Sequence, residues 1–302
     1  TMKQTLLLIG CGDIALRSAT LLRAHYRLIG LCRHPENAPK LREYGITPIF
    51  GDLDKPKTLK KLAGLSHAVL HLAPPPNHGK QDIRTANLLA SLTKRVTKKT
   101  IILPQRFIYI STSGVYGDCN GALTDETRPI KPRMDRSIRR ADAEKKVRNW
   151  GLRNHVNVSI LRVPGIYATE RLPLKRIREG APVLLPDDDC YTNSIHANDL
   201  AYIIFAALRY AKSGRVYNAC DDSTLKMGEY FDLIADFFDM PRPPRVARVN
   251  AYKHISSSML SFMEESRRLT NIRIKNELYI NLRYPTVANG ISAGKAATLE
   301  RG

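Results

Sequence analysis

The chain has 302 residues, of which 43% are apolar and 7% aromatic, and it carries a net charge of +20. This length suffices for one large α/β unit or for two closely joined domains. No run of about 18 uncharged apolar residues occurs, which excludes a membrane-spanning helix and favours a cytoplasmic protein. Five scattered cysteines without a C-x-x-C pair, and eight histidines without ligand spacing, argue against a disulfide framework and a metal site.

The positive charge is concentrated in three segments, at residues 55–61, 94–99 and 128–148. Such charge attracts polyanions. However, aromatic residues do not interleave these segments as a base-stacking surface requires, and no nucleic-acid-binding motif occurs. We therefore expect solvated basic helix faces that favour an anionic cofactor or substrate, and we do not expect nucleic acid as a partner.

Short apolar runs alternate with amphipathic segments through the first half, which is typical of a parallel β-sheet with crossover helices. The expected strands are Thr5–Gly10, Arg27–Cys32, Thr47–Phe50, Ala68–Leu72, Phe107–Ser111 and Ser159–Arg162. The expected helices are Ile14–Ala24, Leu59–Leu65, Gln81–Lys94 and Asp135–Trp150, the last ending at Gly151. The pattern predicts an α/β fold of the Rossmann type, a doubly wound parallel sheet.

The alternation is lost after Gly165, where Pro and charged residues become frequent. A helix at Asp199–Tyr210 and a short strand at Arg215–Ala219 are expected to return to the sheet. We predict a nucleotide-binding core of residues 1–165 and 193–222. A smaller, irregular substrate-binding lobe of residues 166–192 and 223–302 would be interleaved with it. The Pro74–Pro76 loop should lie at the carboxyl edge of the sheet, where parallel sheets bind ligands.

The segment LLLIGCGDIALRSATLL places two glycines between the first strand and the first helix. Gly10 permits a tight turn, Gly12 allows a pyrophosphate to approach the backbone, and the small Ala15 lets the helix pack closely. A glycine turn in a sheet without a dinucleotide is the alternative. We predict that Gly10, Gly12, Asp13, Ile14 and Ala15 form an NAD(P)-binding loop.

The end of the second strand indicates which dinucleotide is bound. An acidic residue there would bind the ribose 2′-hydroxyl, whereas arginine suits a 2′-phosphate. The first charge in LCRHPE is Arg33, which favours NADP over NAD unless Arg33 is only an exposed loop residue. Asp52 either meets the adenine amino group or caps the helix that begins at Pro56. Leu53 and Ala73 are expected beside the cofactor at the same edge.

These motifs resemble the extended short-chain dehydrogenase/reductases, the NAD-dependent epimerase/dehydratase group, and within it an atypical branch. The matching segments are GCGDIA, GDL, STSGVYG, LRVPGIY, YTNSIHANDL and RYPTVANGI, in the expected order over nearly the whole chain. The resemblance implies that Thr112 hydrogen-bonds the reacting oxygen of the substrate and that Ser111 lies beside the cofactor. It also implies a Tyr and a Lys, spaced Y-x-x-x-K on the next helix, as the acid–base pair.

That pair is missing. The alignment places Arg136 at the tyrosine position and Arg140 at the lysine position, and no Y-x-x-x-K occurs in the sequence. Arginine remains protonated at relevant pH and cannot act as the base. Arg136 and Arg140 could instead clamp an anionic substrate, or they could belong to a solvated basic helix.

Other side chains are weaker candidates. His71 ends the fourth strand and could titrate near neutral pH, or it could be structural. Tyr167 and Tyr191 could reach the substrate from the lobe. His196 and Asp199 are expected to be structural, with Asp199 capping the helix that follows. Without the base, Ser111 and Thr112 could serve only to end the strand and line a pocket.

Three functions remain open. The first, which we favour, is an NAD(P)-dependent oxidoreductase or epimerase/dehydratase-like enzyme for a small polar substrate, such as a nucleotide-sugar or another anionic compound. The second is a non-catalytic NAD(P)-binding sensor or assembly protein. The third is a nucleic-acid-binding protein on a dinucleotide-binding scaffold. The resemblance implies a homodimer through helices Gln81–Lys94 and Asp135–Trp150, but two basic helices repel one another, so a monomer is also open.

Overall fold

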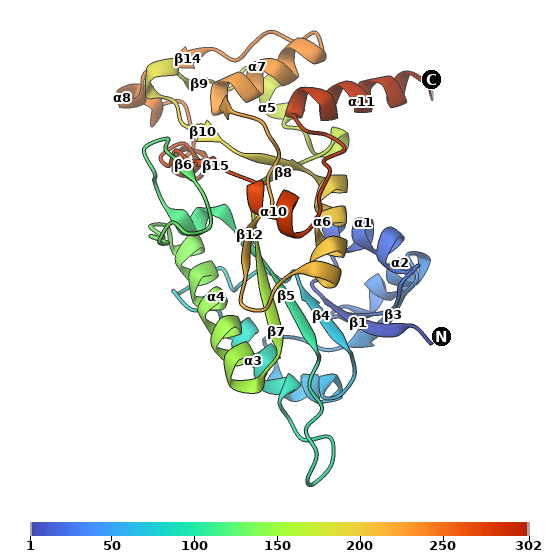
Figure 1. The fold of residues 1–302 in the computed structure, drawn as a ribbon. Coiled ribbons are helices and arrows are strands. Elements are labelled where there is room, and N and C mark those ends of the chain that lie inside the picture. The colour runs from blue at the N-terminus through green and yellow to red at the C-terminus, as the bar shows by residue number, and fades with distance from the viewer. Residues whose placement is uncertain (1, 301–302) are drawn as a thin grey trace.

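A computed structural model describes residues 2–300, with side chains up to residue 297. Its centre is a seven-stranded sheet in the order β12-β7-β5-β4-β1-β2-β3, and every pairing is parallel (Figure 1). The strands are β1 (Gln4–Ile9), β2 (Tyr26–Cys32), β3 (Ile46–Phe50), β4 (Ala68–His71), β5 (Arg106–Thr112), β7 (Asn157–Val163) and β12 (Val216–Asn218). The strand order reverses between β1 and β4. Strands β2 and β3 extend the sheet on one side of β1, and β4, β5, β7 and β12 extend it on the other. The predicted doubly wound fold is confirmed.

Helices cover both faces of the sheet (Figure 1). The helices are α1 (Asp13–Leu22), α2 (Ala38–Glu43), α3 (Ile83–Leu92), α4 (Asp135–Asn154), α5 (Leu174–Arg178), α6 (Ala197–Tyr210), α7 (Met227–Phe237), α8 (Arg248–Ala251), α9 (Ser257–Phe262), α10 (Ile272–Glu277) and α11 (Val287–Glu300). Helices α1 and α6 pack on one face and α3 and α4 on the other. None of the helices among residues 2–300 is long and apolar enough to cross a membrane.

The strand β1 shows why the sequence forms this sandwich. Leu6 and Leu8 belong to the apolar cluster under α1 and α6, while Leu7 and Ile9 belong to the cluster under α3 and α4. All four side chains are fully buried. A strand that is apolar on both faces is required where helices cover both sides of a parallel sheet.

The second half of the chain, joined by the segment that contains β6, builds a lobe over the carboxyl edge of the sheet (Figure 1). Its short strands are β6 (Leu123–Thr124), β8 (Gly165–Tyr167), β9 (Val183–Leu184), β10 (Tyr191–Thr192), β11 (Ser194–His196), β13 (Leu225–Lys226), β14 (Arg245–Val246) and β15 (Arg268–Leu269). A third apolar cluster, which includes Phe231, Ile234 and Val287, forms the centre of this lobe. Ile274, Leu278 and Leu282 pack instead with the cluster under α1 and α6, so α10 belongs with the core and not with the predicted lobe.

Three local predictions need correction. Helix α4 does not end at Gly151 but continues to Asn154, and His155 ends it in the left-handed conformation. Gly151 serves close packing, because a Cβ there would lie 2.5 Å from a methyl group of Val158. The predicted helix at Leu59–Leu65 is a 3₁₀ helix at Pro56–Leu62. Asp199 does not cap α6, because the His196 side chain accepts the bond from the Asn198 N–H.

Candidate functional site

A cavity of about 800 Å³ opens at the carboxyl ends of β1 and β2, next to the point where the strand order reverses. Its walls include Gly10, Gly12 and Asp13 from the glycine turn, with Arg33 from the end of β2. We call it the first cavity. Ligands of doubly wound sheets bind in this position, outside the carboxyl ends of the strands.

Gly10 and Gly12 shape the floor of the first cavity in different ways. Gly10 has φ +89°, and a Cβ there would lie 2.5 Å from the backbone nitrogen of Ala73. Gly12 precedes α1, and no described atom comes within 4 Å of the place where its Cβ would be. The turn therefore needs glycine at residue 10 for close backbone packing, while the space above Gly12 and the helix N-terminus is open, as a bound phosphate requires.

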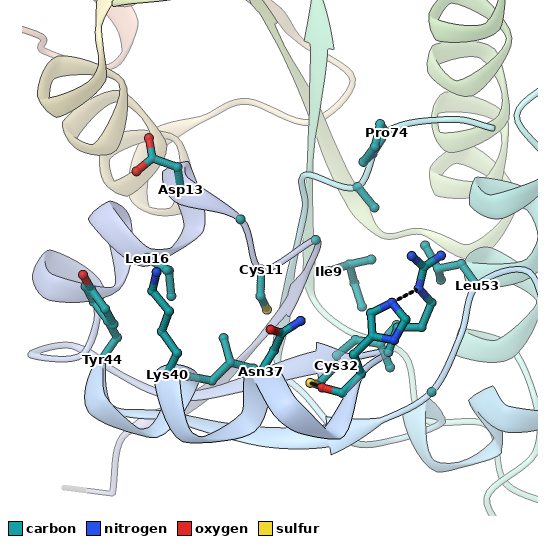
Figure 2. A pocket seen from close by; sticks show the side chains of 18 of the residues that line it. Ile9, Cys11, Asp13, Leu16, Cys32, Asn37, Lys40, Tyr44, Leu53 and Pro74 are labelled. Atoms are coloured by element: carbon teal, nitrogen blue, oxygen red, sulfur yellow. Dashed lines mark hydrogen bonds between the residues drawn. The ribbon is translucent and has the colours of Figure 1, made fainter. Parts of the chain in front are cut away.

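Cationic side chains lie at the β2 end of the first cavity. Figure 2 shows Lys40 and Asn37 on the segment after β2, with Leu53 and Pro74 across the cavity. Arg33 is exposed, and its Nε donates to Nε2 of His34 over 3.0 Å. Neither Arg33 nor Lys40 forms an ion pair with any residue in the described range 2–300. This end of the cavity can therefore offer two cations to an anionic group.

The remaining predicted cofactor residues fall into two groups. Asp52, Leu53 and Ala73 line the first cavity. Asp52 does not cap the following 3₁₀ helix, since Lys55 occupies that position and Oδ1 of Asp52 accepts from the Asp54 N–H at 2.8 Å. By contrast, Ile14 and Ala15 pack towards the core and line neither cavity.

Ser111 also lies away from both cavities. Its side chain is buried, and its Oγ donates to Oε2 of Glu144 at 2.6 Å. Glu144 is 1% exposed and also pairs with the buried Arg162. This geometry gives no support to the predicted contact between Ser111 and the cofactor, because the hydroxyl is bound to a carboxylate that belongs to a buried ion pair.

A second cavity of about 630 Å³ lies between α4, the end of β5 and the lobe. It shares Pro74 with the first cavity, so the two are adjacent at the sheet edge. Of the residues predicted to meet the substrate, Thr112, Arg136, Arg140 and Tyr191 line it, which the sequence spacing alone could not establish. The Oγ1 of Thr112 accepts the Gly114 N–H at 3.2 Å, and part of the residue remains exposed.

Arginines form the α4 side of the second cavity. Nη1 of Arg140 donates to the Tyr109 hydroxyl and to the Ile110 carbonyl, both at 3.2 Å. Nη1 of Arg136 donates to Oγ of Ser261 at 2.9 Å, and its guanidinium lies 4.0 Å from the centre of the Phe262 ring. Neither arginine forms an ion pair with a carboxylate of the described residues. Both are half-buried, so they are not part of a fully solvated basic face.

Sequence reasoning missed several residues of the second cavity. Arg139, Tyr230, Glu265 and Arg267 line it, and Arg267 pairs with the buried Glu265 at 3.3 Å. Arg139 was visible as part of the basic run on α4. Tyr230 lies on the amphipathic helix α7, which was not among the expected helices, whereas Glu265 and Arg267 come from a lobe segment without periodicity or motif. Only the folded chain brings these residues together. Lys40 of the first cavity was missed because it lies on α2, a short helix that the sequence analysis did not predict.

Tyr230 of the second cavity is not activated as a base. Burial raises the pKa of Tyr230 to about 12, the direction opposite to that needed for proton transfer near neutral pH. Tyr167, predicted to reach the substrate, lines neither cavity. It is 2% exposed, and its hydroxyl donates to the Thr286 carbonyl inside the lobe core. The predicted substrate contact of Tyr167 therefore finds no support.

The first of the titratable candidates, His71, is structural. His71 is completely buried, and its Nε2 lies 2.8 Å from the Thr85 hydroxyl. Burial lowers the pKa of His71 to about 3, so it does not titrate near neutral pH as the sequence left open. Asp199 is also structural, although it is not a helix cap: its carboxylate accepts the backbone N–H groups of Arg283 and Tyr284, both at 2.9 Å.

Known proteins resemble this chain over most of its length. A conserved protein of unknown function from Silicibacter pomeroyi has a TM-score of 0.81 at 28% identity, over 98% of this chain and 99% of that one. An uncharacterised Schizosaccharomyces pombe protein is 25% identical over 73% of this chain and 75% of its own length. The dTDP-glucose 4,6-dehydratase of Bacillus anthracis in complex with NAD shares the fold, with a TM-score of 0.76 at 17% identity over 98% and 97% of the two chains.

The family comparison covers most of the core. Residues 17–220 match the model of the NAD dependent epimerase/dehydratase family. The match begins just after the glycine turn, so Gly10 and Gly12 are supported by their geometry and not by the match. It includes β2, the end of β5 and the whole of α4. The fold, the strand order and this match agree: the chain belongs to the NAD dependent epimerase/dehydratase family.

Proposed function

We propose that this protein is an NAD(P)-dependent oxidoreductase or epimerase/dehydratase-type enzyme that acts on a small, polar, anionic substrate. The observation that carries the proposal is the pair of adjacent cavities at one sheet edge. One contains the glycine turn, and the other contains Thr112 and the α4 arginines. Family membership and the NAD-bound Bacillus anthracis relative support a nicotinamide dinucleotide in the first cavity.

The first cavity fits a dinucleotide on three structural grounds. The N-terminus of α1 is open above Gly12, the turn at Gly10 approaches Ala73 closely, and the cavity extends from there to the end of β2. When bound there, the nicotinamide supplies hydride transfer. Arg33 and Lys40 are placed to hold a ribose 2′-phosphate, and we therefore propose NADP as the preferred form.

The second cavity would hold the substrate in the proposed enzyme. The family resemblance would place Arg136 and Arg140 at the positions of its tyrosine and lysine. Both line this cavity, where they could offer guanidinium donors to a carboxylate or a phosphate. Thr112 can hydrogen-bond the oxygen of the reacting group. A nucleotide-sugar, the substrate class that the family resemblance implies, would satisfy both contacts. The lobe predicted at residues 166–192 and 223–302, without α10, would close this cavity.

A second function rests on the chemistry of the same cavity. Neither Arg136 nor Arg140 can act as a base, because arginine stays protonated. The raised pKa of Tyr230 disfavours that residue as a base as well. These features favour a non-catalytic NAD(P)-binding sensor or assembly protein. Such a protein would bind the dinucleotide in the first cavity, as the enzyme would, but would not turn over a substrate.

Calorimetric titration with NADPH, NADP, NADH and NAD tests the shared part of both functions. Gly12→Asp should abolish binding because it places a carboxylate where the phosphate would lie. Gly12→Ala should weaken binding less, because its Cβ meets no protein atom and takes only part of the space that the phosphate would use. Absence of saturable binding by all four dinucleotides would contradict both functions. Steady-state assays with NADPH and a panel of nucleotide-sugars and anionic carbonyl compounds then separate them, since only the enzyme turns over.

A further inference from the structure

Four charged side chains connect α1 to the lobe at the mouth of the first cavity. Asp13 and Arg17 belong to the first two turns of α1, and Glu170 and Arg171 belong to the 3₁₀ helix Thr169–Arg171 of the lobe. Nη1 of Arg171 lies 2.6 Å from Oδ2 of Asp13, and Nε of Arg17 lies 3.0 Å from the same oxygen. Arg17 also pairs with Glu170. We call these four residues the ionic clasp.

The clasp stands where the pyrophosphate of a dinucleotide would bind. Asp13, Arg17 and Glu170 line the first cavity, and Asp13 is the first residue of α1, directly after the open space at Gly12. A helix N-terminus attracts anions through its free N–H groups. Arg17 thus lines the anion site beside two carboxylates, and Arg171, which does not line the cavity, reaches its edge through the pair with Asp13. The carboxylates occupy the guanidinium donors that a phosphate would use.

The carboxylates of the clasp can be displaced. The Glu170 and Asp13 side chains are 61% and 49% exposed, whereas those of Arg171 and Arg17 are 35% and 20% exposed. Exposed ion pairs contribute little to stability, because water solvates both partners almost as well. Burial raises the pKa of Asp13, but hydrogen bonds from Arg171 and Arg17 outweigh this and leave the pKa lowered. Asp13 is therefore ionised and bears a charge that a phosphate can replace.

We propose that Arg17 and Arg171 are pyrophosphate-binding residues. They exchange the carboxylates of Asp13 and Glu170 for phosphate oxygens when a dinucleotide is bound. Guanidinium binds phosphate in the same bidentate way as carboxylate, so the exchange keeps both arginines paired. Arg171 then connects the lobe directly to the cofactor. This inference rests on the proposed function and adds lobe residues to the dinucleotide site.

The exchange predicts opposite effects for two neighbouring residues. Arg171→Gln removes a phosphate donor and should weaken NADPH binding about tenfold, the loss of one charge-assisted contact. Arg171→Lys keeps the charge without the bidentate geometry, so its affinity for NADPH should lie between those of the wild type and Arg171→Gln. Glu170→Gln removes a competing carboxylate and should tighten binding by roughly two- to fivefold. Arg178→Gln, which removes an exposed lobe arginine outside both cavities, is the matched control and should change affinity less than twofold.

The experiment is calorimetric titration of the full chain and these four variants with NADPH, at physiological salt, after thermal melts show that each variant is folded. Arg171→Gln binding as tightly as Arg178→Gln would overturn the inference, and so would weaker binding by Glu170→Gln. If the wild-type chain itself fails to bind NADPH, the proposed function has failed, and the inference falls with it. A defect confined to Arg171 variants leaves the proposed function intact and supports the clasp.

Discussion

Glu144 on α4 and Arg162 on β7 form an ion pair that is almost completely buried. Oε1 of Glu144 lies 2.7 Å from Nη2 of Arg162, and the two side chains are 1% and 4% exposed. Glu144 also accepts the Ser111 hydroxyl, so one carboxylate joins α4, β5 and β7. Thr112 follows Ser111, and Arg140 lies one helical turn before Glu144. The buried pair therefore helps to position Thr112 and Arg140, which line the second cavity.

Removing one member of this pair should destabilise the fold strongly. Glu144→Gln leaves the Arg162 charge buried without a counter-ion, which costs about 3–5 kcal/mol. Urea unfolding followed by circular dichroism measures the loss. Glu179→Gln breaks the exposed pair with Lys175 and should cost under about 1 kcal/mol. Equal losses in the two variants would show that the buried pair does not hold the sheet edge together.

Gly10 should be irreplaceable by alanine while Gly12 tolerates it. The Cβ of Gly10→Ala would lie 2.5 Å from a backbone atom of Ala73, in a backbone conformation that alanine rarely adopts. We expect a loss of about 2 kcal/mol or more. The same change at Gly12 meets open space and should leave the free energy of unfolding within about 0.5 kcal/mol of wild type. Comparable losses at both positions would contradict the turn geometry.

Arg33 should determine dinucleotide preference. Arg33→Gln is expected to weaken NADPH binding about tenfold and to leave NADH binding unchanged, because only NADPH carries the 2′-phosphate. Arg42→Gln removes an exposed charge from the neighbouring helix α2 without touching the cavity, and is the control. An equal loss for NADPH and NADH on titration would assign Arg33 a general electrostatic role instead of recognition of the 2′-phosphate.

Asp221 makes stability depend on pH. Burial raises its pKa to about 7, above the unfolded value of 3.8, so the folded state holds its proton more firmly. Its contribution to stability is full below about pH 4 and is lost as pH rises through 7. Between pH 5 and 8 we expect the loss to be about 2 kcal/mol.

Asp221→Asn should remove this loss, which urea unfolding at pH 5 and pH 8 would measure as a difference from wild type. Asp236→Asn alters an exposed carboxylate that pairs with Arg242 on the surface of the lobe, and the lowered pKa of Asp236 predicts no change over the same range. If the wild type and Asp221→Asn show the same pH dependence, Asp221 is ionised in the fold without penalty.

The core could be predicted from sequence because its signals are local and repeated. The strand from Leu6 to Ile9 has apolar side chains on both of its faces. Gly10 and Gly12, which follow it, indicate a turn between a strand and a helix. The role of Gly151 could not be predicted, because glycine serves both helix ends and close packing, and only the contact with Val158 distinguishes the two. Helix α2 was missed because it has six residues, one of them Pro39, and only two of them are buried.

The candidate site was predictable only in part. Thr112, Arg136 and Arg140 could be located because β5 and α4 are adjacent in the chain and the resemblance aligns them. Tyr167 was misplaced because sequence does not show which face of β8 turns towards the lobe core. Glu265 and Arg267 come from a segment without periodicity, and their place in the second cavity depends on tertiary packing of the lobe.

The contact between Arg136 and Phe262 has a mechanical consequence. Arg136 attaches α4 to α9 through the Phe262 ring and through the Ser261 hydroxyl. Arg136→Ala would lose both attachments at once, because alanine has neither a charge nor a hydrogen-bond donor. The wall of the second cavity and the attachment of α9 to the core therefore depend on one side chain, and neither can change without the other.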